Sequence, residues 1–122
     1  ESQFAPMSGN GPFLISLSTK NKQTKEALNV IQNVLRTYID KGPTDAEMNA
    51  AKQYLIGSFP LSLSGNRSIA TLLLRMTFYH LPEDFLDTYT ARINAITSEQ
   101  VKQAFQQQVN PDKLLLVTVG KS

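Results

Sequence analysis

The stretch FLISLSTK, residues 13–20, decides whether this chain is all-helical or contains a sheet. Phe13, Ile15 and Leu17 fall on one side of an extended backbone, because successive side chains of a strand point to opposite faces. The preceding residues 8–12, SGNGP, are dense in turn-forming residue types. The alternation and the turn together predict a strand that forms a hairpin with the segment before it.

The middle of the chain carries the periodicity of helices. Apolar residues recur at intervals of three and four, which places them on one face of a helix. Thr44 with Glu47, and Thr97 with Gln100, have the spacing of a capping box at a helix N-terminus. The predicted helices cover about residues 23–41, 44–57, 67–81, 82–96 and 97–109.

The chain closes with a second segment of strand-like composition, LLLVTVG at residues 114–120. Its apolar and β-branched residues predict a strand that ends at Gly120. The order strand, strand, five helices, strand predicts an α+β fold. In this fold an antiparallel sheet, made of the N-terminal hairpin and the C-terminal strand, packs against the five helices. The length of 122 residues fits a single domain that spans residues 1–122.

One predicted helix is apolar on nearly every side. The segment 67–81, RSIATLLLRMTFYHL, distributes its aliphatic and aromatic residues around most of the helix circumference. A helix of this kind is either central in its domain or covered by a partner. Arg67 and Arg75 flank the apolar residues, and we interpret them as side chains that extend from a packed helix to solvent.

The composition excludes several kinds of site. The 12 basic and 10 acidic residues give a net charge of +2, and the basic residues are scattered, so we expect no nucleic-acid partner. The chain has no cysteine and one histidine, which excludes thiolate sites and any two-histidine metal site. No long apolar run predicts a membrane span. Since the chain opens with Glu1 and without a signal peptide, we expect a processed or excised part of a longer protein.

The stretch FYHLPEDF, residues 78–85, resembles the zinc motif H-x-x-E-H without its second histidine. That motif needs its ligands on one continuous helix, but Pro82 lies between His80 and Glu83. We therefore predict that His80 ends one helix and that Pro82 begins the next, with Glu83 and Asp84 as favourable charges in its first turn. The residues alone predict no metal site, no catalytic residue and no complete active site in this chain.

Two longer runs carry a family resemblance. They are GPTDAEMNAAKQYLIGSFPLSLSGN, residues 42–66, and FYHLPEDFLDTYTARINAITSEQVKQAFQQQVNPDKLLLVTVG, residues 78–120. Both resemble the C-terminal domains of the insulinase/pitrilysin family of zinc metallopeptidases, which includes mitochondrial processing peptidase. The resemblance covers about residues 11–120.

The resemblance implies where zinc and substrate would be bound. Members of this family have two similar α+β halves, and the N-terminal half carries H-x-x-E-H. We therefore expect no cofactor here, and zinc in a catalytic half-domain or in a homologous zinc-bearing subunit. This chain would be the C-terminal part of the other half, and would help to enclose and position a peptide substrate.

The family also suggests a place for the substrate and for the protein. In some members an Arg and a Tyr hold the substrate, on elements that would precede Glu1 in this chain. Ser2 and Phe4 would continue that strand, so we predict that they form the edge of the substrate cleft. The GSFPL stretch, residues 57–61, resembles bacterial members that work as pairs of periplasmic chains. The resemblance therefore predicts a periplasmic location.

Two other functions remain open from the sequence. The chain could be a proteolytically inactive family member that acts as an assembly or interaction subunit. It could also be an unrelated binding module that uses the apolar helix 67–81 as a docking face. Exposure of that helix to solvent would favour docking, and protection would make the helix part of the core.

Overall fold

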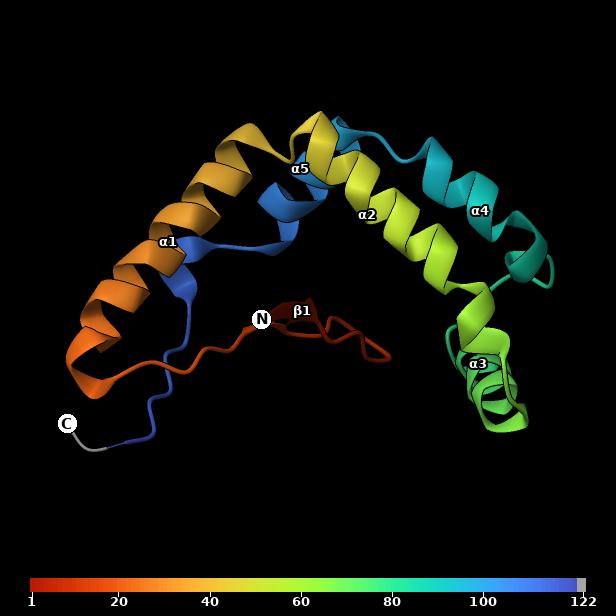
Figure 1. The fold of residues 1–122 in the computed structure, drawn as a ribbon, viewed down its shortest axis with the longest axis horizontal. Helices are drawn as coiled ribbons and strands as arrows, with labels where there is room; N and C mark the ends of the chain where they lie inside the picture. The colour runs from red at the N-terminus through yellow and green to blue at the C-terminus, as the bar shows by residue number, and fades with distance from the viewer. Residues whose placement is uncertain (121–122) are drawn as a thin grey trace. The chain divides into compact units, whose positions relative to one another are not determined.

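The computed structural model describes residues 1–120, in which a short hairpin is followed by helices (Figure 1). The hairpin consists of β1 (Ser2–Phe4) and β2 (Phe13–Ile15). The α-helices of the described residues are α1 (Thr24–Lys41), α2 (Asp45–Ser58), α3 (Asn66–Phe78), α4 (Phe85–Ala95) and α5 (Ser98–Gln108). Single 3-10 turns lie at η1 (Asn21–Gln23), η2 (Pro60–Leu63) and η3 (Pro111–Lys113). The predicted α+β class is confirmed.

The chain divides into two compact units. Unit 1 comprises residues 1–43 together with the chain from Glu99 onward, and unit 2 comprises Thr44–Ser98. Unit 1 therefore contains the hairpin, α1, nearly all of α5 and the C-terminal segment. Unit 2 contains α2, α3 and α4. Within the described range 1–120, no helix combines the length and the hydropathy needed to cross a membrane.

The hairpin of unit 1 forms as the sequence predicts, although it is shorter. The strands are antiparallel, with Phe4 opposite Phe13 and Ser2 opposite Ile15. The N–H of Ala5 donates to the carbonyl oxygen of Pro12 at 2.9 Å, which closes the ladder at the loop. Gly11 is required in this loop, because a Cβ there would collide with the carbonyl group of Ala5.

Four aromatic rings join the hairpin to the two helices of unit 1. The Phe105 ring on α5 lies 5.4 Å from Phe4, 5.7 Å from Phe13 and 4.8 Å from Tyr38 on α1, measured between centroids, and all three pairs meet edge-on. Edge-to-face contacts of this kind stabilise aromatic pairs beyond the burial of their area. Close by in sequence, Val109 is 6% exposed, as is Leu35 on α1. These residues form the core of unit 1.

The predicted C-terminal strand is wrong for the described residues. The sheet contains β1 and β2, and residues 114–119 follow η3 as an extended segment without strand pairing (Figure 1). No backbone hydrogen bond joins this segment to another part of the described chain. Leu115 is 91% exposed and Val119 is 99% exposed. A strand is stabilised by its neighbour, and β2 ends at Ile15 before it could provide one.

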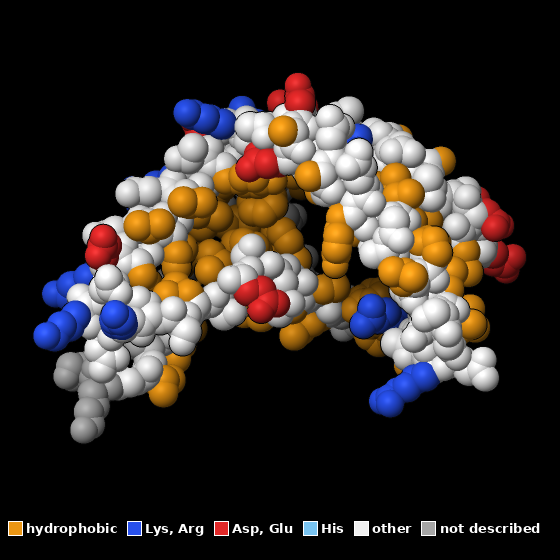
Figure 2. Space-filling model, in the orientation of Figure 1, with side chains coloured by type: hydrophobic (Ala, Val, Ile, Leu, Met, Phe, Trp, Pro, Cys, Tyr) orange, Lys and Arg blue, Asp and Glu red, His pale blue; other side chains and the backbone are white. Residues whose placement is uncertain are grey.

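Unit 2 begins with the predicted capping box. The N–H of Glu47 donates to the hydroxyl oxygen of Thr44 at 3.3 Å, and the N–H of Thr44 donates to the Glu47 carboxylate at 2.8 Å. At the other end of α2, Phe59 stacks on Tyr89 of α4 with ring centroids 3.9 Å apart. No residue of this unit falls in the buried class. Hydrophobic side chains are correspondingly visible at the surface (Figure 2).

The apolar helix of unit 2 is exposed. α3 is predicted at 67–81 and forms at Asn66–Phe78, and of its residues Leu72 and Met76 alone are even half-buried. Leu74 is 69% exposed and Phe78 is 56% exposed. The structure therefore excludes a central position for α3 within unit 2. The other alternative, a helix that a partner covers, remains.

The Phe105 ring sets the stability of unit 1. We expect Phe105→Ala to lower the free energy of unfolding by about 2 kcal/mol or more, because the ring contacts both the hairpin and α1. Urea unfolding followed by far-UV circular dichroism measures the change. Leu115→Ala is the control, since that side chain is 91% exposed and its loss should cost less than about 0.5 kcal/mol. Equal effects of the two substitutions would contradict the packing described for unit 1.

The capping box of α2 makes the stability of the fold decrease as the pH falls. The backbone N–H and then the hydroxyl of Thr44 hydrogen-bond the Glu47 carboxylate and lower its pKa. A lowered folded-state pKa stabilises the fold above the ordinary glutamate pKa, and this contribution is lost as the pH falls through the lowered value.

Thermal unfolding at neutral and acidic pH should therefore show a smaller acid destabilisation for Glu47→Gln than for the parent chain. Thr44→Ala should cost about 1 kcal/mol at neutral pH. An unchanged acid destabilisation in Glu47→Gln would show that the cap does not couple to folding.

Candidate functional site

A groove of unit 1 lies between two extended segments. It has a volume of about 530 Å³ and is lined by residues 13–19 on one side and 114–119 on another. α1 contributes a third side, with Thr24, Leu28, Ile31 and Gln32. Residues 13–19 lie beside α1 because they lead into that helix through η1. Residues 114–119 lie beside α1 because they follow η3, whose Asp112 pairs with Arg36 of α1.

The groove offers apolar side chains and free backbone groups. Leu28 and Ile31 of α1 are half-buried, and Leu116 and Val117 of the C-terminal segment remain largely exposed. Residues 114–119 make no backbone hydrogen bond to another described segment, so their N–H and C=O groups can pair with an added chain. Extended peptides bind such edges by main-chain hydrogen bonds, with pockets for alternate side chains. The groove is therefore suited to an extended, largely apolar polypeptide.

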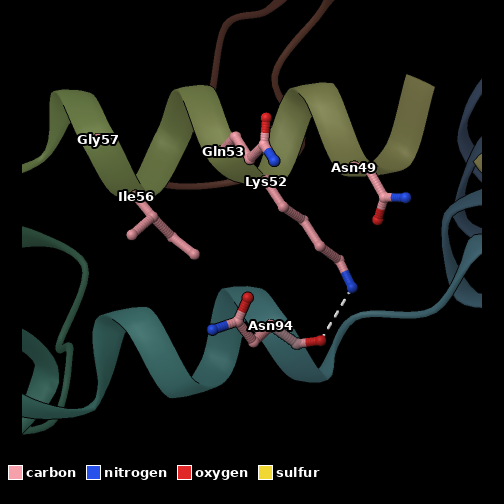
Figure 3. Close-up of a pocket in the computed structure, with 6 residues that line it drawn as sticks. All are labelled: Asn49, Lys52, Gln53, Ile56, Gly57 and Asn94. Atoms are coloured by element: carbon pink, nitrogen blue, oxygen red, sulfur yellow. Dashed lines mark hydrogen bonds between the residues drawn. The ribbon is translucent and has the colours of Figure 1, made fainter. Parts of the chain in front are cut away.

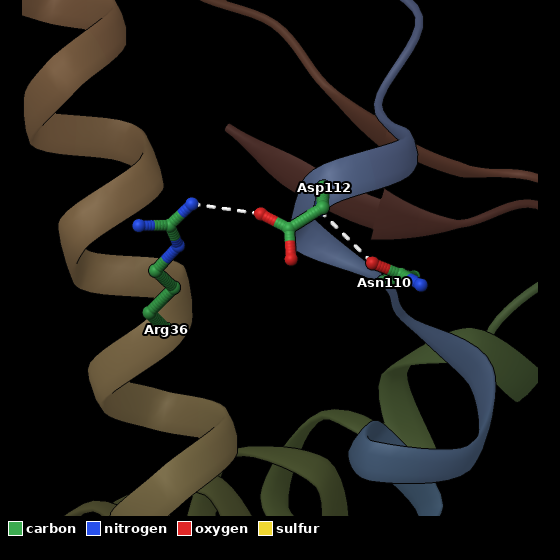
Figure 4. Close-up of polar contacts among 3 residues, drawn as sticks. All are labelled: Arg36, Asn110 and Asp112. Atoms are coloured by element: carbon green, nitrogen blue, oxygen red, sulfur yellow. Dashed lines mark hydrogen bonds and ion pairs between the residues drawn. The ribbon is translucent and has the colours of Figure 1, made fainter.

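An ion pair anchors the start of the C-terminal segment to α1. The Arg36 guanidinium donates to the Asp112 carboxylate at 2.7 Å, and the N–H of Asp112 donates to the Asn110 side-chain oxygen at 2.9 Å (Figure 4). Both partners of the ion pair are exposed, at 57% and 75% of their side-chain surface. The contact therefore positions η3 more than it stabilises the fold.

The predicted cleft-edge residues lie next to this groove. Ser2 is paired with Ile15, and Phe4 is paired with Phe13, and both of these partners line the groove. Ser2 and Phe4 themselves do not line it. Phe4 packs its ring 4.8 Å from Phe13 and belongs to the aromatic cluster. A role for Ser2 and Phe4 at the edge of a substrate cleft stays a prediction.

Unit 2 contains a second pocket that the sequence reasoning missed. Its volume is about 420 Å³, and it is lined by Asn49, Lys52, Gln53, Ile56 and Gly57 of α2 and by Asn94 of α4 (Figure 3). The Lys52 ammonium group donates to the backbone oxygen of Asn94 at 2.8 Å. The spacing of the α2 residues at i, i+3, i+4, i+7 and i+8 could have indicated this pocket, because it places them on one helix face. Amides and one cation can bind polar groups, but they form no nucleophile and base pair.

Phe78 of the FYHLPEDF stretch ends α3, Phe85 begins α4, and residues 79–84 form the turn between the two helices. His80 adopts a left-handed backbone conformation, with φ of 51°, two residues after α3 ends. The prediction that Pro82 begins the next helix is wrong, because α4 begins at Phe85. Pro82 instead opens a turn, in which its carbonyl oxygen accepts the N–H of Phe85 at 3.0 Å.

The donor set of this chain does not fit a zinc ion. Protein zinc sites use three or four Cys, His or carboxylate ligands, and the sequence has one histidine and no cysteine. Within residues 1–120, no three such side chains are grouped so that they could hold a metal ion.

Comparison with known proteins finds similarity to one family. The family described as peptidase M16 inactive domain matches residues 1–55. A crystal structure of a peptidase M16 inactive domain from Pseudomonas fluorescens is 38% identical, with a TM-score of 0.82 over 92% of this chain. The chain spans 26% of that protein's chain. Among curated proteins, none matches the sequence.

The chain is similar to the peptidase M16 inactive domain over residues 1–55, and 92% of the chain resembles part of the solved inactive domain. The family resemblance carried by residues 42–66 and 78–120 is thereby confirmed at this level. The match to residues 1–55 includes the hairpin and α1, which also form two sides of the groove in unit 1.

The contribution of the Arg36–Asp112 ion pair to stability should depend on salt concentration. Arg36→Ala should lower the free energy of unfolding by about 0.5 kcal/mol or less in dilute buffer, because both charges are exposed. The difference between variant and parent should vanish at about 1 M NaCl, where screening is nearly complete. Denaturant unfolding at both salt concentrations measures it. A difference that persists at high salt would indicate that Arg36 contributes packing and not charge.

Proposed function

We propose that this chain is a non-catalytic, C-terminal portion of a zinc metallopeptidase-like protein that helps to enclose and position a peptide substrate. The observation that carries the proposal is the groove of unit 1, where residues 114–119 offer unpaired backbone groups beside apolar side chains of α1. An extended peptide is the ligand that such a groove fits best. Ser2 and Phe4, on the strand next to the groove, would form the edge of the cleft.

Catalysis belongs to another part of the assembly in this proposal. A zinc-bearing catalytic half-domain, or a homologous zinc-bearing subunit, would activate water for peptide hydrolysis. The unsuitable donor set of this chain and its similarity to an inactive-domain family support that division. Residues 1–122 would be the C-terminal part of one half-domain, and the likeness to 26% of a longer solved chain supports this. The periplasm remains the proposed location.

One observation favours a second function, that of a proteolytically inactive assembly or interaction subunit. α3 exposes Leu73, Leu74 and Phe78, and their exposed fractions are 51%, 69% and 56%. An exposed apolar helix is typical of a surface that another protein covers. This function does not require the groove of unit 1 to bind a peptide, so a test of the groove separates the two.

The first proposal predicts peptide binding without cleavage. A fluorescein-labelled peptide of alternating Val and Thr should bind the 122-residue chain in a fluorescence anisotropy titration, because it can pair with residues 114–119. Ile31→Asp, which places a charge in the groove, should weaken binding by about 10-fold or more. With zinc chloride added, the peptide should be recovered intact by mass spectrometry.

A matched control lies on the same helix. Val34→Asp introduces the same charge on α1 at a residue that is 62% exposed and does not line the groove. It should leave the affinity within about twofold of the parent value. Equal weakening by both substitutions, or no binding at all, would overturn the groove as a peptide site and leave the assembly function.

A further inference from the structure

α3 carries an exposed stripe with the spacing of a helix-packing face. The stripe consists of Ala70, Leu73, Leu74, Thr77 and Phe78, at i, i+3, i+4, i+7 and i+8, and every member is in the exposed class. With about 100° of rotation per residue, the stripe points away from Leu72 and Met76, the half-buried residues of the helix. A stripe of this kind packs against a second helix when one is available.

The polar groups of the stripe do not oppose packing. The Thr77 hydroxyl donates to the carbonyl oxygen of Leu73 at 3.0 Å, so its hydrogen bond is already made within the helix. The Thr77 methyl group is then the part of that side chain that a neighbour would meet. Ala70 and Thr77 are small, which lets a second helix approach closely between the larger Leu74 and Phe78.

Charges of opposite sign stand at the two ends of α3. Arg67 lies in the first turn of the helix and Arg75 in its last turn, and the three acidic residues Glu83, Asp84 and Asp87 follow the C-terminal end and outnumber Arg75 there. Residues 48–82 contain no Asp or Glu. In the described range 1–120, no ion pair joins Arg67 or the acidic residues to another side chain. A helix of this length spans about 20 Å, so the two groups are separated along it.

We propose that α3 is a self-association surface on which the α3 helix of a second copy of this chain packs antiparallel. An antiparallel, two-fold arrangement brings Arg67 of each copy beside Glu83 and Asp84 of the other. A parallel arrangement would place Arg67 beside Arg67. The stripe and its two charged ends are therefore self-complementary in one orientation, and all of these residues belong to unit 2.

The same charges disfavour an anionic membrane as the occupant. A membrane surface would attract Arg67 and Arg75, but it would repel Glu83, Asp84 and Asp87 at the other end of the helix. A second copy satisfies both groups at once. Because one short helix per copy forms the contact, we expect a weak and concentration-dependent dimer.

The dimer is tested first by its dependence on the stripe. Sedimentation velocity of the 122-residue chain should show the weight-average mass rising from monomer toward dimer with concentration. Leu74→Glu should abolish the rise, since it places a charge at the centre of the contact. Val34→Glu should leave it unchanged, because that side chain is 62% exposed, lies in unit 1 and does not line the groove. Circular dichroism confirms that each variant keeps its helices.

Charge reversal and mixing test the antiparallel orientation. Arg67→Glu alone, and the double variant Glu83→Arg with Asp84→Arg alone, should each weaken self-association by about 10-fold or more, because like charges then face each other at both ends. An equimolar mixture of these two variants should dimerise as the parent does, because both contacts in the mixed dimer pair opposite charges.

Three results would overturn the proposal. They are a parent chain that stays monomeric at every concentration, a mixture that fails to restore the dimer, and association unaffected by Leu74→Glu. Cosedimentation of a monomeric parent chain with phosphatidylglycerol vesicles, lost in Arg67→Glu, would assign α3 to a membrane surface instead.

Discussion

The contact of the Phe105 ring with Phe4, Phe13 and Tyr38 is the interaction on which unit 1 depends. It joins a hairpin of three-residue strands to α1 and α5, and isolated hairpins of this size are marginal in water. Because the hairpin is held there, the chain that follows β2 is held beside α1. That arrangement opens the groove toward residues 114–119. The aromatic cluster therefore links the family-matched N-terminal segment to the candidate peptide site.

The sequence predicts the local features of this fold well, because local chemistry determines them. The helix periodicity, the capping box at Thr44 and the hairpin all depend on neighbours within a few residues. The strand at residues 114–120 depends on a partner that is distant in sequence, and composition alone cannot supply one. The turn at Pro82 was misplaced for a related reason, since a proline favours the first turn of a helix and the start of a tight turn alike. The pocket at Asn49 was missed because polar residues on a helix usually face solvent.

The proposed function rests on the apolar side chains that the chain leaves exposed. Leu35 and Val109 are the buried hydrophobic residues of the described chain, and many large apolar side chains remain at the surface. Five of them lie in residues 114–119 of unit 1, and four lie on α3 of unit 2. The two proposals rest on these exposed residues, with an extended peptide as the proposed ligand beside residues 114–119 and a helix as the proposed partner of α3.

Hydrogen exchange of the 122-residue chain tests the central claim, that residues 114–119 are unpaired and leave the groove open. The amides of α1 around Leu35 should exchange slowly, because that residue lies in the core. The amides of residues 114–119 should exchange at rates close to those of an unstructured peptide, because no backbone hydrogen bond in the described chain holds them. Protection of residues 114–119 comparable to that of α1 would contradict the account, since it would show that the segment is a paired strand and that the groove is closed.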